Sequence, residues 1–245
     1  MSAGADPGLS FAGLPLFRGV SAATRDNLLG SAVAHAVAAG AILFEQGDAP
    51  NFQHVVVSGS VQLFGRSAAR REVLIEVVGA PDLIIPAAVA TDSPYLMRAV
   101  APEPSRILLI HAAAFRAAVA SDPDLARQVI DSLAGQFRRM VRQVKNLKLR
   151  SAVERVGCYI LVLSARQGTL DRAVLPYEKK LIASELGITR ESFSRALATL
   201  QKSGVVVQGD VIAIVDRARL AAQCKPDPLI DGPERESQAA EIESA

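Results

Sequence analysis

The sequence predicts an α+β chain in which an antiparallel β-barrel, a long helix and a domain of alternating helices and strands follow one another. Short runs rich in Val and Ile, separated by Gly, Asp and Pro, occupy about residues 40–110. This pattern is typical of an all-β sandwich or barrel. Residues 121–150 then carry apolar side chains at helical spacing. Beyond them, helix signals alternate with two short β-branched runs, which indicates a second domain of mixed type.

Length and composition limit the class of protein. The chain has 245 residues, half of them hydrophobic, which is enough for one large domain or two ordinary ones. Its two cysteines, Cys158 and Cys224, are too few for a disulfide framework, a structural zinc site or a cysteine-ligated iron–sulfur cluster. Neither a signal peptide nor an apolar stretch long enough to span a membrane is present in the sequence. We therefore expect a soluble, cytoplasmic protein with no membrane partner.

Charge is distributed unevenly along the chain. The formal net charge is +2, from 27 Lys and Arg against 25 Asp and Glu. The segment from Gln223 to Ala245 holds six acids and two bases, so the rest of the chain has 25 bases against 19 acids. Residues 138–150 hold six bases and no acid. The placement of charge therefore keeps a nucleic-acid partner open, although the total does not suggest one.

The N-terminal half is predicted to be a lead-in followed by the barrel. Residues 1–20 are rich in Gly, Ala and Ser, and we expect a loose segment there. The barrel is expected over residues 21–120, because each apolar run in it ends at turn residues. Its predicted strands are residues 41–44, 55–57, 61–64, 73–78 and 107–110.

One helix is predicted over residues 121–150, because no Pro follows Pro123 and Ser121 or Asp122 can cap its start. Apolar residues recur along it at alternating spacings of three and four, as in a helix that pairs with another helix. This predicted seam consists of Ile130, Leu133, Phe137, Met140, Val144 and Leu147. Basic residues flank the seam, which favours a homodimer over the alternative, a helix packed only on its own domain.

Residues 151–222 have the layout of a winged helix-turn-helix. Glycines stand where its helices should end, and Gln208-Gly209-Asp210 joins two β-branched runs into a hairpin, the wing. The predicted elements are helices at 152–165, 179–186 and 189–203, a hairpin at 205–215 and a short helix after Asp216. The polar tail, residues 223–245, is predicted to be disordered.

The helix over residues 189–203 has two different faces. Its buried stripe consists of Phe193, Ala196, Leu197 and Leu200, at i, i+3, i+4 and i+7. The side chains expected to reach base edges in the major groove are Arg190, Glu191, Ser194 and Arg195. Arg suits guanine O6 and N7, and Glu accepts from the cytosine amino group. The alternative is an ordinary solvated face, which the turn, the wing and the pairing helix together disfavour.

A longer pattern surrounds this helix. Residues 181–205 read LIASELGITRESFSRALATLQKSGV, residues 44–48 read FEQGD and residues 57–61 read VSGSV. These motifs resemble the CRP/FNR family of bacterial transcription regulators, and the resemblance covers about residues 15–222 in the family's order. It implies a jelly-roll sensor domain similar to a cyclic-nucleotide-binding domain. It also implies a homodimer that binds an inverted repeat in double-stranded DNA and acts with RNA polymerase.

The resemblance implies roles for single residues. Glu191, Ser194 and Arg195 match the base-reading positions of the FNR and nitric-oxide-responsive branches, which favour TTGA-like half-sites. Arg190 is similar to the cyclic-AMP-responsive branch. Other groups would hold DNA phosphates, which position the protein without reading sequence. These candidates are Thr189, Ser192, Lys179, Lys180 and Lys202.

The predicted sensor pocket departs from the cyclic-nucleotide-binding members. Those members have a Gly-Glu pair for the ribose and an Arg-Ser/Thr pair for the phosphate, but here residues 83–89 read LIIPAAV and Tyr95-Leu96 stands near the second pair. An apolar wall cannot offset the desolvation of a phosphate, so cyclic AMP is disfavoured, with Arg98 leaving room for a rearranged site. The candidate effector pocket consists of Ile84, Ile85, Pro86, Tyr95 and Arg98.

Haem is the cofactor that the sequence does not disfavour, because the family contains haem-based sensors of NO, CO or O₂. The candidate iron ligands are His35, His54 and His111. A lone His in an apolar strand is more often a core residue, so a core position is the favoured interpretation of each. The iron–sulfur mode is disfavoured, because the N-terminal cysteine cluster of the oxygen-sensing branch is missing. A redox role for Cys158 is disfavoured as well, since buried thiols are usually inert.

Other functional classes are disfavoured. The sequence contains no Walker A loop, Gly-x-Ser-x-Gly elbow, His-Glu-x-x-His or Gly-x-Gly-x-x-Gly motif, so we expect no enzyme. A nucleotide-responsive regulatory subunit would keep the phosphate-binding residues and lack the winged helix, and this chain shows the reverse. An adaptor that does not read bases would need no base-reading face.

Overall fold

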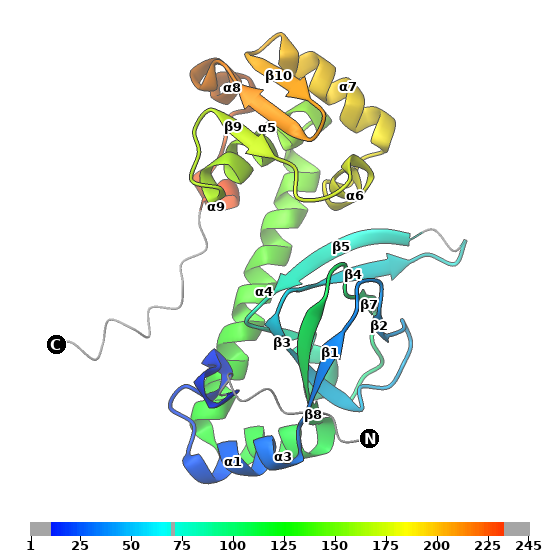
Figure 1. Ribbon diagram of the computed structural model, residues 1–245, viewed down its shortest axis with the longest axis vertical. Helices are drawn as coiled ribbons and strands as arrows, with labels where there is room; N and C mark the ends of the chain where they lie inside the picture. Colours follow the sequence, from blue (N-terminus) through cyan, green and yellow to red (C-terminus); the bar gives the residue numbers. More distant parts are fainter. Residues whose placement is uncertain (1–10, 70–71, 233–245) are drawn as a thin grey trace, which may run out of the picture. The chain divides into compact units, whose positions relative to one another are not determined.

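The computed structural model describes residues 11–69 and 72–232 (Figure 1). The chain forms two compact units, Met1–Gln136 and Phe137–Ala245, named here the sandwich unit and the helix-turn-helix unit. The boundary between them lies within helix α4 (Pro123–Leu149). In the part of the chain that the structure describes, no helix has both the length and the apolar character needed to cross a bilayer.

Two four-stranded antiparallel sheets form the sandwich unit (Figure 1). One sheet has the order β1-β8-β3-β6 and the other β2-β7-β4-β5, so neighbouring strands are mostly distant in sequence, as in a jelly roll. The strands are β1 (Val33–Val37), β2 (Ile42–Phe44), β3 (Phe52–Ser58), β4 (Ser60–Arg66), β5 (Glu72–Gly79), β6 (Asp82–Ile84), β7 (Arg98–Val100) and β8 (Ser105–His111). The five predicted strands all lie within β2, β3, β4, β5 and β8, apart from one residue at the start of β2.

Strand β3 shows why the apolar runs are continuous. Its residues Val55 and Val57 face a core shared with helices, whereas Val56 faces the core between the two sheets. Both faces are buried, so the strand has no need for polar residues at alternate positions. The strands that sequence reasoning missed are β1, whose first four residues are exposed, and the three-residue strands β6 and β7.

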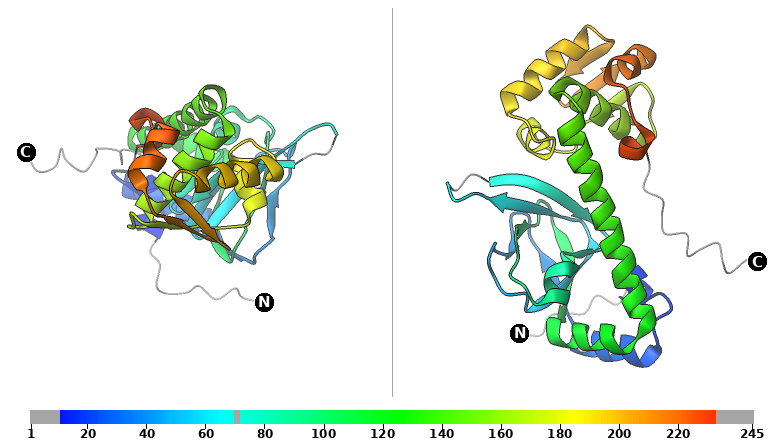
Figure 2. Two further views of the ribbon diagram at one scale, coloured as in Figure 1. Left: turned by 90° about the horizontal axis from the view of Figure 1, so that it is seen from above. Right: turned by 180° about the vertical axis from the view of Figure 1, so that it is seen from behind.

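Short helices complete the sandwich unit. Helix α1 (Ala22–Ser31) and helix α3 (Ala112–Ser121) lie side by side at one end of the sheets, as Figure 2 shows from behind. Helix α2 (Pro86–Thr91) follows β6. The loose lead-in expected over residues 1–20 is wrong for residues 11–20, because two 3-10 turns place Leu16 and Phe17 in the core. Residues 1–10 lie outside the described part of the chain.

Helix α4 begins where Asp122 caps it. The Asp122 carboxylate accepts hydrogen bonds from the backbone N–H groups of Asp124 (3.1 Å) and Leu125 (3.2 Å). The hydroxyl of Thr24 and these backbone groups lower the pKa of Asp122 to about 2. The cap therefore stays ionised at neutral pH and stabilises the positive end of the helix dipole. The predicted helix over residues 121–150 thus runs from Pro123 to Leu149.

The helix-turn-helix unit contains the rest of α4, five further helices and a three-stranded sheet of order β10-β11-β9. Helix α5 starts with a complete capping box between Ser151 and Glu154. The elements are α5 (Ala152–Arg166), β9 (Arg172–Val174), α6 (Lys179–Glu185), α7 (Arg190–Gln201), β10 (Val205–Gln208), β11 (Val211–Ile214), α8 (Arg217–Cys224) and α9 (Pro228–Asp231). The predicted α+β class is thereby confirmed, with β9 and α9 as additions.

The disorder predicted for residues 223–245 is wrong for its first ten residues. Helix α9 starts at Pro228, and the Asp227 side chain accepts from the N–H of Leu229 (2.8 Å). The guanidinium of Arg150 donates to both carboxylate oxygens of Asp231, one of them at 2.8 Å. Polar composition suggested disorder, but Asp231 is neutralised by Arg150, the residue that follows α4. Residues 233–245 lie outside the described residues.

Candidate nucleic-acid interface

The turn between α6 and α7 depends on Gly187. Its φ of +64° lies in the left-handed region, which side chains other than Gly adopt at a cost. A Cβ atom there would also lie 2.4 Å from Cδ2 of Leu147 on α4. Two residues later, the Thr189 hydroxyl accepts from the N–H of Ser192 (3.1 Å) and caps α7. The predicted turn and cap are therefore both present in the structure.

Helix α7 is anchored by one face. Phe193, Ala196, Leu197 and Leu200, the predicted stripe, are all buried. They share one core with residues of α5, α6, α8 and the wing sheet. This packing fixes the rotation of α7 about its axis, and so it decides which side chains point outward.

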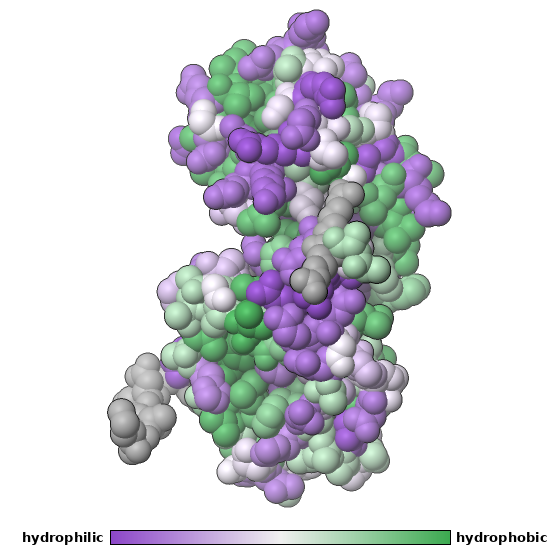
Figure 3. Space-filling view, turned by 90° about the vertical axis from the view of Figure 1, so that its right-hand side faces the viewer, coloured by the Kyte–Doolittle hydropathy of each residue, from purple (hydrophilic) through white to green (hydrophobic). Residues whose placement is uncertain are grey.

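The outward face holds the predicted base-reading residues. Arg190, Glu191, Ser194 and Arg195 are exposed and together line one open hollow along the N-terminal half of α7. Figure 3 shows hydrophilic side chains gathered on the side of the unit where α6 and α7 lie. Backbone hydrogen bonding at the helix start and the Thr189 side chain, helped by the two arginines, lower the pKa of Glu191. The face thus presents two fixed cations and one fixed anion, a set of donors and acceptors suited to base edges.

The candidate phosphate-contacting side chains differ in whether their polar groups already have hydrogen-bond partners within the chain. The hydroxyls of Thr189 and Ser192 hydrogen-bond to each other at 3.1 Å. The ammonium of Lys179 donates to the carbonyl oxygen of Gly209 in the wing turn (2.7 Å), which uses one of its three donors. Lys180 and Lys202 are exposed. The second role of Lys179, tying α6 to the wing, is one that sequence reasoning missed.

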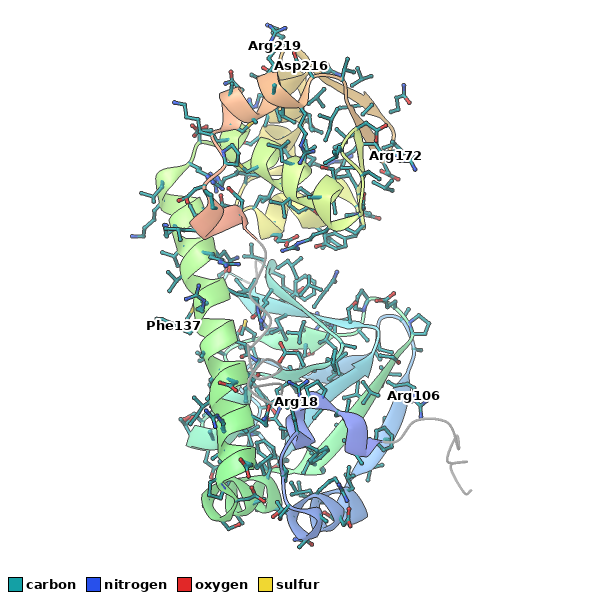
Figure 4. All side chains as sticks on the ribbon, turned by 90° about the vertical axis from the view of Figure 1, so that its left-hand side faces the viewer. Arg18, Arg106, Phe137, Arg172, Asp216 and Arg219 are labelled. Carbon is teal, nitrogen blue, oxygen red and sulfur yellow. The ribbon has the colours of Figure 1, made fainter. Side chains whose placement is uncertain are left out.

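The wing is a sheet of three strands instead of the predicted two. Strand β9 pairs with β11 through Val174 and Val211, and the N–H of Leu175 donates to the carbonyl of Asp210 at 2.9 Å. Figure 4 marks Arg172 on this strand, together with Asp216, whose side chain caps α8 by accepting from the N–H of Arg219 (2.9 Å). Strand β9 has only three residues, too few to give a period in the sequence.

The predicted seam on α4 is largely exposed. Ile130 is 62% exposed and Phe137 61%, and Phe137 projects from the helix into solvent in Figure 4. Met140, Val144 and Leu147 are exposed as well. Leu133 differs, because it is half-buried against the core of the sandwich unit. Exposed apolar side chains in a row on one helix are typical of a surface that a partner covers.

Some basic side chains of residues 138–150 have ion-pair or hydrogen-bond partners within the chain. Besides the ion pair of Arg150 with Asp231, Lys145 lies 3.6 Å from the carboxylate of Asp227. Arg142 donates to the carbonyl of Gly232 (3.3 Å). Arg142, Lys145 and Arg150 thus bind described residues of the segment that follows α8. Sequence reasoning missed this match, because the partners are more than 80 residues apart.

Three of the five candidate pocket residues lie together: Ile84 and Tyr95 share one core cluster, and Ile85 packs against it. Ile84 and Pro86 are buried, and Ile85 takes a left-handed φ of 44° at the start of α2. Arg98 forms ion pairs with Glu45 (3.3 Å) and Glu72 (3.1 Å), so its charge is already matched. Tyr95 alone among them lines a hollow of the sandwich unit.

The histidines do not fit a haem site. His35 and His111 are exposed, and His54 is buried on β3. The ring of Phe44 lies 5.1 Å from His54 and stacks on Tyr95 at 3.7 Å, so aromatic rings occupy the space beside the imidazole. The hollow there measures about 260 Å³, below the usual range of about 300–1,000 Å³ for drug-sized ligands. No three His, Cys, Asp or Glu side chains gather as metal ligands in the ranges that the structure describes.

The two cysteines are buried thiols. Cys158 donates through its sulfur to the carbonyl of Cys224 at 3.3 Å. Burial raises the pKa of Cys158 to about 12 and that of Cys224 to about 11. Both therefore stay protonated at neutral pH, and a thiol is a poor nucleophile.

Two family models match the chain in the observed order. One describes a cyclic nucleotide-binding domain and matches residues 34–122, and the other describes a Crp-like helix-turn-helix domain and matches residues 154–223. A CRP-like cAMP-activated global transcriptional regulator of Mycobacterium tuberculosis is 26% identical over 191 residues, which cover 76% of this chain and 85% of the relative. The cyclic AMP receptor protein of Thermus thermophilus is 27% identical over 208 residues, covering 85% and 95%.

A solved structure shares the fold. FixK2 of Bradyrhizobium japonicum superposes with a TM-score of 0.65 at 21% identity, covering 78% of this chain and 96% of FixK2. At this identity the likeness concerns the fold alone.

Proposed function

Because the chain belongs to the CRP/FNR family of transcription regulators, we propose that it acts as a homodimer that reads an inverted repeat through helix α7. Its relatives are DNA-binding regulators and not enzymes. The proposal adds the base-reading residues, the dimer seam and TTGA-like half-sites. It also adds RNA polymerase as a partner and the cytoplasm as the location.

The observation that carries the proposal is the two-sided character of α7. One side is fixed by Phe193 and Leu200, which are fully buried. The other side presents Arg190, Glu191, Ser194 and Arg195 in one hollow. Ala198 is exposed on the same helix, and its small side chain lets the helix approach the groove closely. A helix held in this way can place its N-terminal residues against base edges without losing further backbone entropy.

The seam on α4 supports the dimer. Five exposed apolar side chains in a row leave apolar surface in water, and a second copy of α4 would bury it. A two-fold dimer places its recognition helices about 34 Å apart, so that they meet successive major grooves on one side of the duplex. This spacing matches an inverted repeat.

Cyclic AMP does not fit as the signal. Strand β6 and helix α2 bring Leu83, Ile84 and Ile85 where a ribose-binding carboxylate would be needed. Arg98, the nearest cation, is held by Glu45 and Glu72. An anion that entered here would compete with two carboxylates for one guanidinium.

The test is a binding titration on labelled duplexes, one with two TTGA-like half-sites as an inverted repeat and one with the same bases scrambled. Arg195→Ala is expected to lose about 1–3 kcal/mol of discrimination at one base pair. Glu191→Gln should relax preference at a neighbouring pair. Arg219→Ala, which removes an exposed guanidinium on α8, is the matched control and should bind as the parent protein does.

Two outcomes would contradict the proposal. If Arg195→Ala weakened binding equally on both duplexes, the guanidinium would be a phosphate contact. If the parent protein bound scrambled DNA as tightly as the repeat, α7 would not read bases in this sequence.

A further inference from the structure

The sandwich unit contains an aromatic hollow that the proposed function does not use. Its volume is about 260 Å³. The chain has only eight Phe, three Tyr and no Trp, yet three of these rings meet here. Its lining includes Phe44, Asp48, Phe52, His54 and Tyr95. These residues come from β2, β3, the loop between them and the loop before β7. Phe44 and Tyr95 also pack in one core cluster with Ile84, so the hollow borders the apolar segment 83–89.

His54 is the imidazole in the lining of this hollow. The side chain is 6% exposed, and its Nδ1 atom is buried with no hydrogen-bond partner among the described residues. Burial lowers the pKa of His54 to about 4, so the imidazole is neutral at physiological pH. A buried imidazole nitrogen without a partner costs free energy, which a ligand with an N–H or O–H group would recover.

The charge of the hollow is negative at its mouth. Asp48 is exposed and holds one carboxylate oxygen on the N–H of Glu45 (2.9 Å). Its charge also contributes to the raised pKa of Tyr95, after burial of that ring. None of the lining residues is a Lys or Arg, and Arg98 is paired with Glu45 and Glu72. The hollow therefore attracts cations and repels carboxylates and phosphates.

The size of the hollow limits the ligand. A cavity of about 150 Å³ holds benzene, whereas drug-sized sites begin near 300 Å³. The hydroxyl of Tyr95 already donates to the carbonyl of Phe52 (3.0 Å), so its ring acts as a wall. A flat molecule of one or two fused rings fits this volume and these walls.

We propose that this hollow binds a small aromatic amine, with its rings against Phe44, Phe52 and Tyr95, its cationic amine at Asp48 and a ring N–H at His54. The inference concerns ligand binding by the sandwich unit and does not depend on DNA recognition. The proposed ligand is a cation, whereas cyclic AMP, which the names of the relatives contain, is an anion.

Tryptamine is a suitable probe, since it carries an indole N–H and an ammonium. The chain contains no Trp, so the fluorescence of the indole can be excited and followed without a protein signal. We expect saturable binding to the full-length protein. Indole-3-propionate, which has a carboxylate in place of the ammonium, should bind at least about tenfold more weakly, because it loses a charge-assisted contact and gains a repulsion.

Two variants test the two polar contacts. Asp48→Asn keeps an acceptor for the Glu45 N–H and removes the charge, so it should weaken tryptamine by about tenfold and leave indole unchanged. Asp26→Asn removes an exposed carboxylate of α1 in the same unit and should have no effect. 1-Methyltryptamine, which lacks the ring N–H, should bind several-fold more weakly to the parent protein but equally with tryptamine to His54→Leu.

The 1-methyltryptamine comparison on the parent protein needs no variant, so it holds even where a variant fails to fold. Equal affinity for tryptamine and indole-3-propionate would overturn the role of Asp48. Equal affinity of the parent protein for tryptamine and its methylated form would overturn the role of His54. No saturation with any of these probes would refute the site itself, while DNA binding measured on the same sample would be unaffected.

Discussion

Acidification should destabilise the sandwich unit through His54. Burial lowers the pKa of this imidazole from 6.5 to about 4, so between these values the unfolded chain binds a proton that the folded chain does not. Stability is therefore full above pH 6.5 and falls as the pH falls. Each pH unit inside the window changes the free energy of unfolding by up to about 1.4 kcal/mol. From about pH 7 to about pH 5 the loss amounts to about 2 kcal/mol, because the unfolded imidazole is only partly protonated at the upper end.

The assay is urea unfolding at a series of pH values, followed by amide hydrogen exchange in peptides from β3 and β8. These peptides report on the sandwich unit separately from the helix-turn-helix unit. His54→Leu removes the titrating group, so its stability should be nearly flat between about pH 7 and pH 5. His35→Leu, which removes an exposed His on β1, is the matched control and should follow the parent protein.

The pH series for the parent protein and its variants ends near pH 5, above the range in which Asp122 loses its contribution to stability. The pKa of Asp122 is held at about 2 by hydrogen bonds from Thr24 and from backbone N–H groups, so its contribution is lost only below its ordinary value of 3.8. That loss occurs in every variant. Equal destabilisation of the parent protein and His54→Leu between about pH 7 and pH 5 would refute the reasoning, because the imidazole would then not be buried in its neutral form.

Three further predictions concern the helix-turn-helix unit and α4. Gly187→Ala should lower the free energy of unfolding by about 1–2 kcal/mol through left-handed strain, with the exposed Leu147 side chain turning aside, and Gly209→Ala, with φ +62° and open space, should cost a similar amount in the same urea titration. Phe137→Ala should weaken the dimer on the order of a hundredfold in sedimentation equilibrium, and Arg138→Ala, exposed beside the seam, should not. Asp231→Asn should cost about 2 kcal/mol in urea unfolding, because it leaves the largely buried guanidinium of Arg150, just after α4, with a weakened partner; unchanged stability would mean that α9 is not held by this pair.

Local signals in the sequence were sufficient for the recognition helix. Thr189 is a cap because its hydroxyl reaches an N–H three residues on, and the buried stripe of α7 follows from a spacing within one helix. These relations involve neighbours in the chain, so the sequence contains both partners within a few positions. The same holds for the long run of β3, which reads as strand because both of its faces are buried.

The features that the sequence did not predict share a physical cause, because each depends on residues distant in the chain. Strand β1 is an exposed edge with little apolar signal, and β6 and β9 have three residues each. They are strands because neighbours distant in sequence pair with them. Arg98 looked free for a ligand, because nothing in the sequence says that Glu45 and Glu72 would meet it.

The sequence by itself determined the order of the domains, the turn, the cap and the buried face of α7. Those features depend on spacing, conformational preference and hydrogen bonds between near neighbours. Only the tertiary structure decided that Asp227 and Asp231 neutralise bases at the C-terminal end of α4 and just after it, and that His54 is buried beside Phe44 and Tyr95. Pairing of charges and rings across long stretches of chain depends on how the elements pack, and packing sums many weak contacts that no single motif encodes.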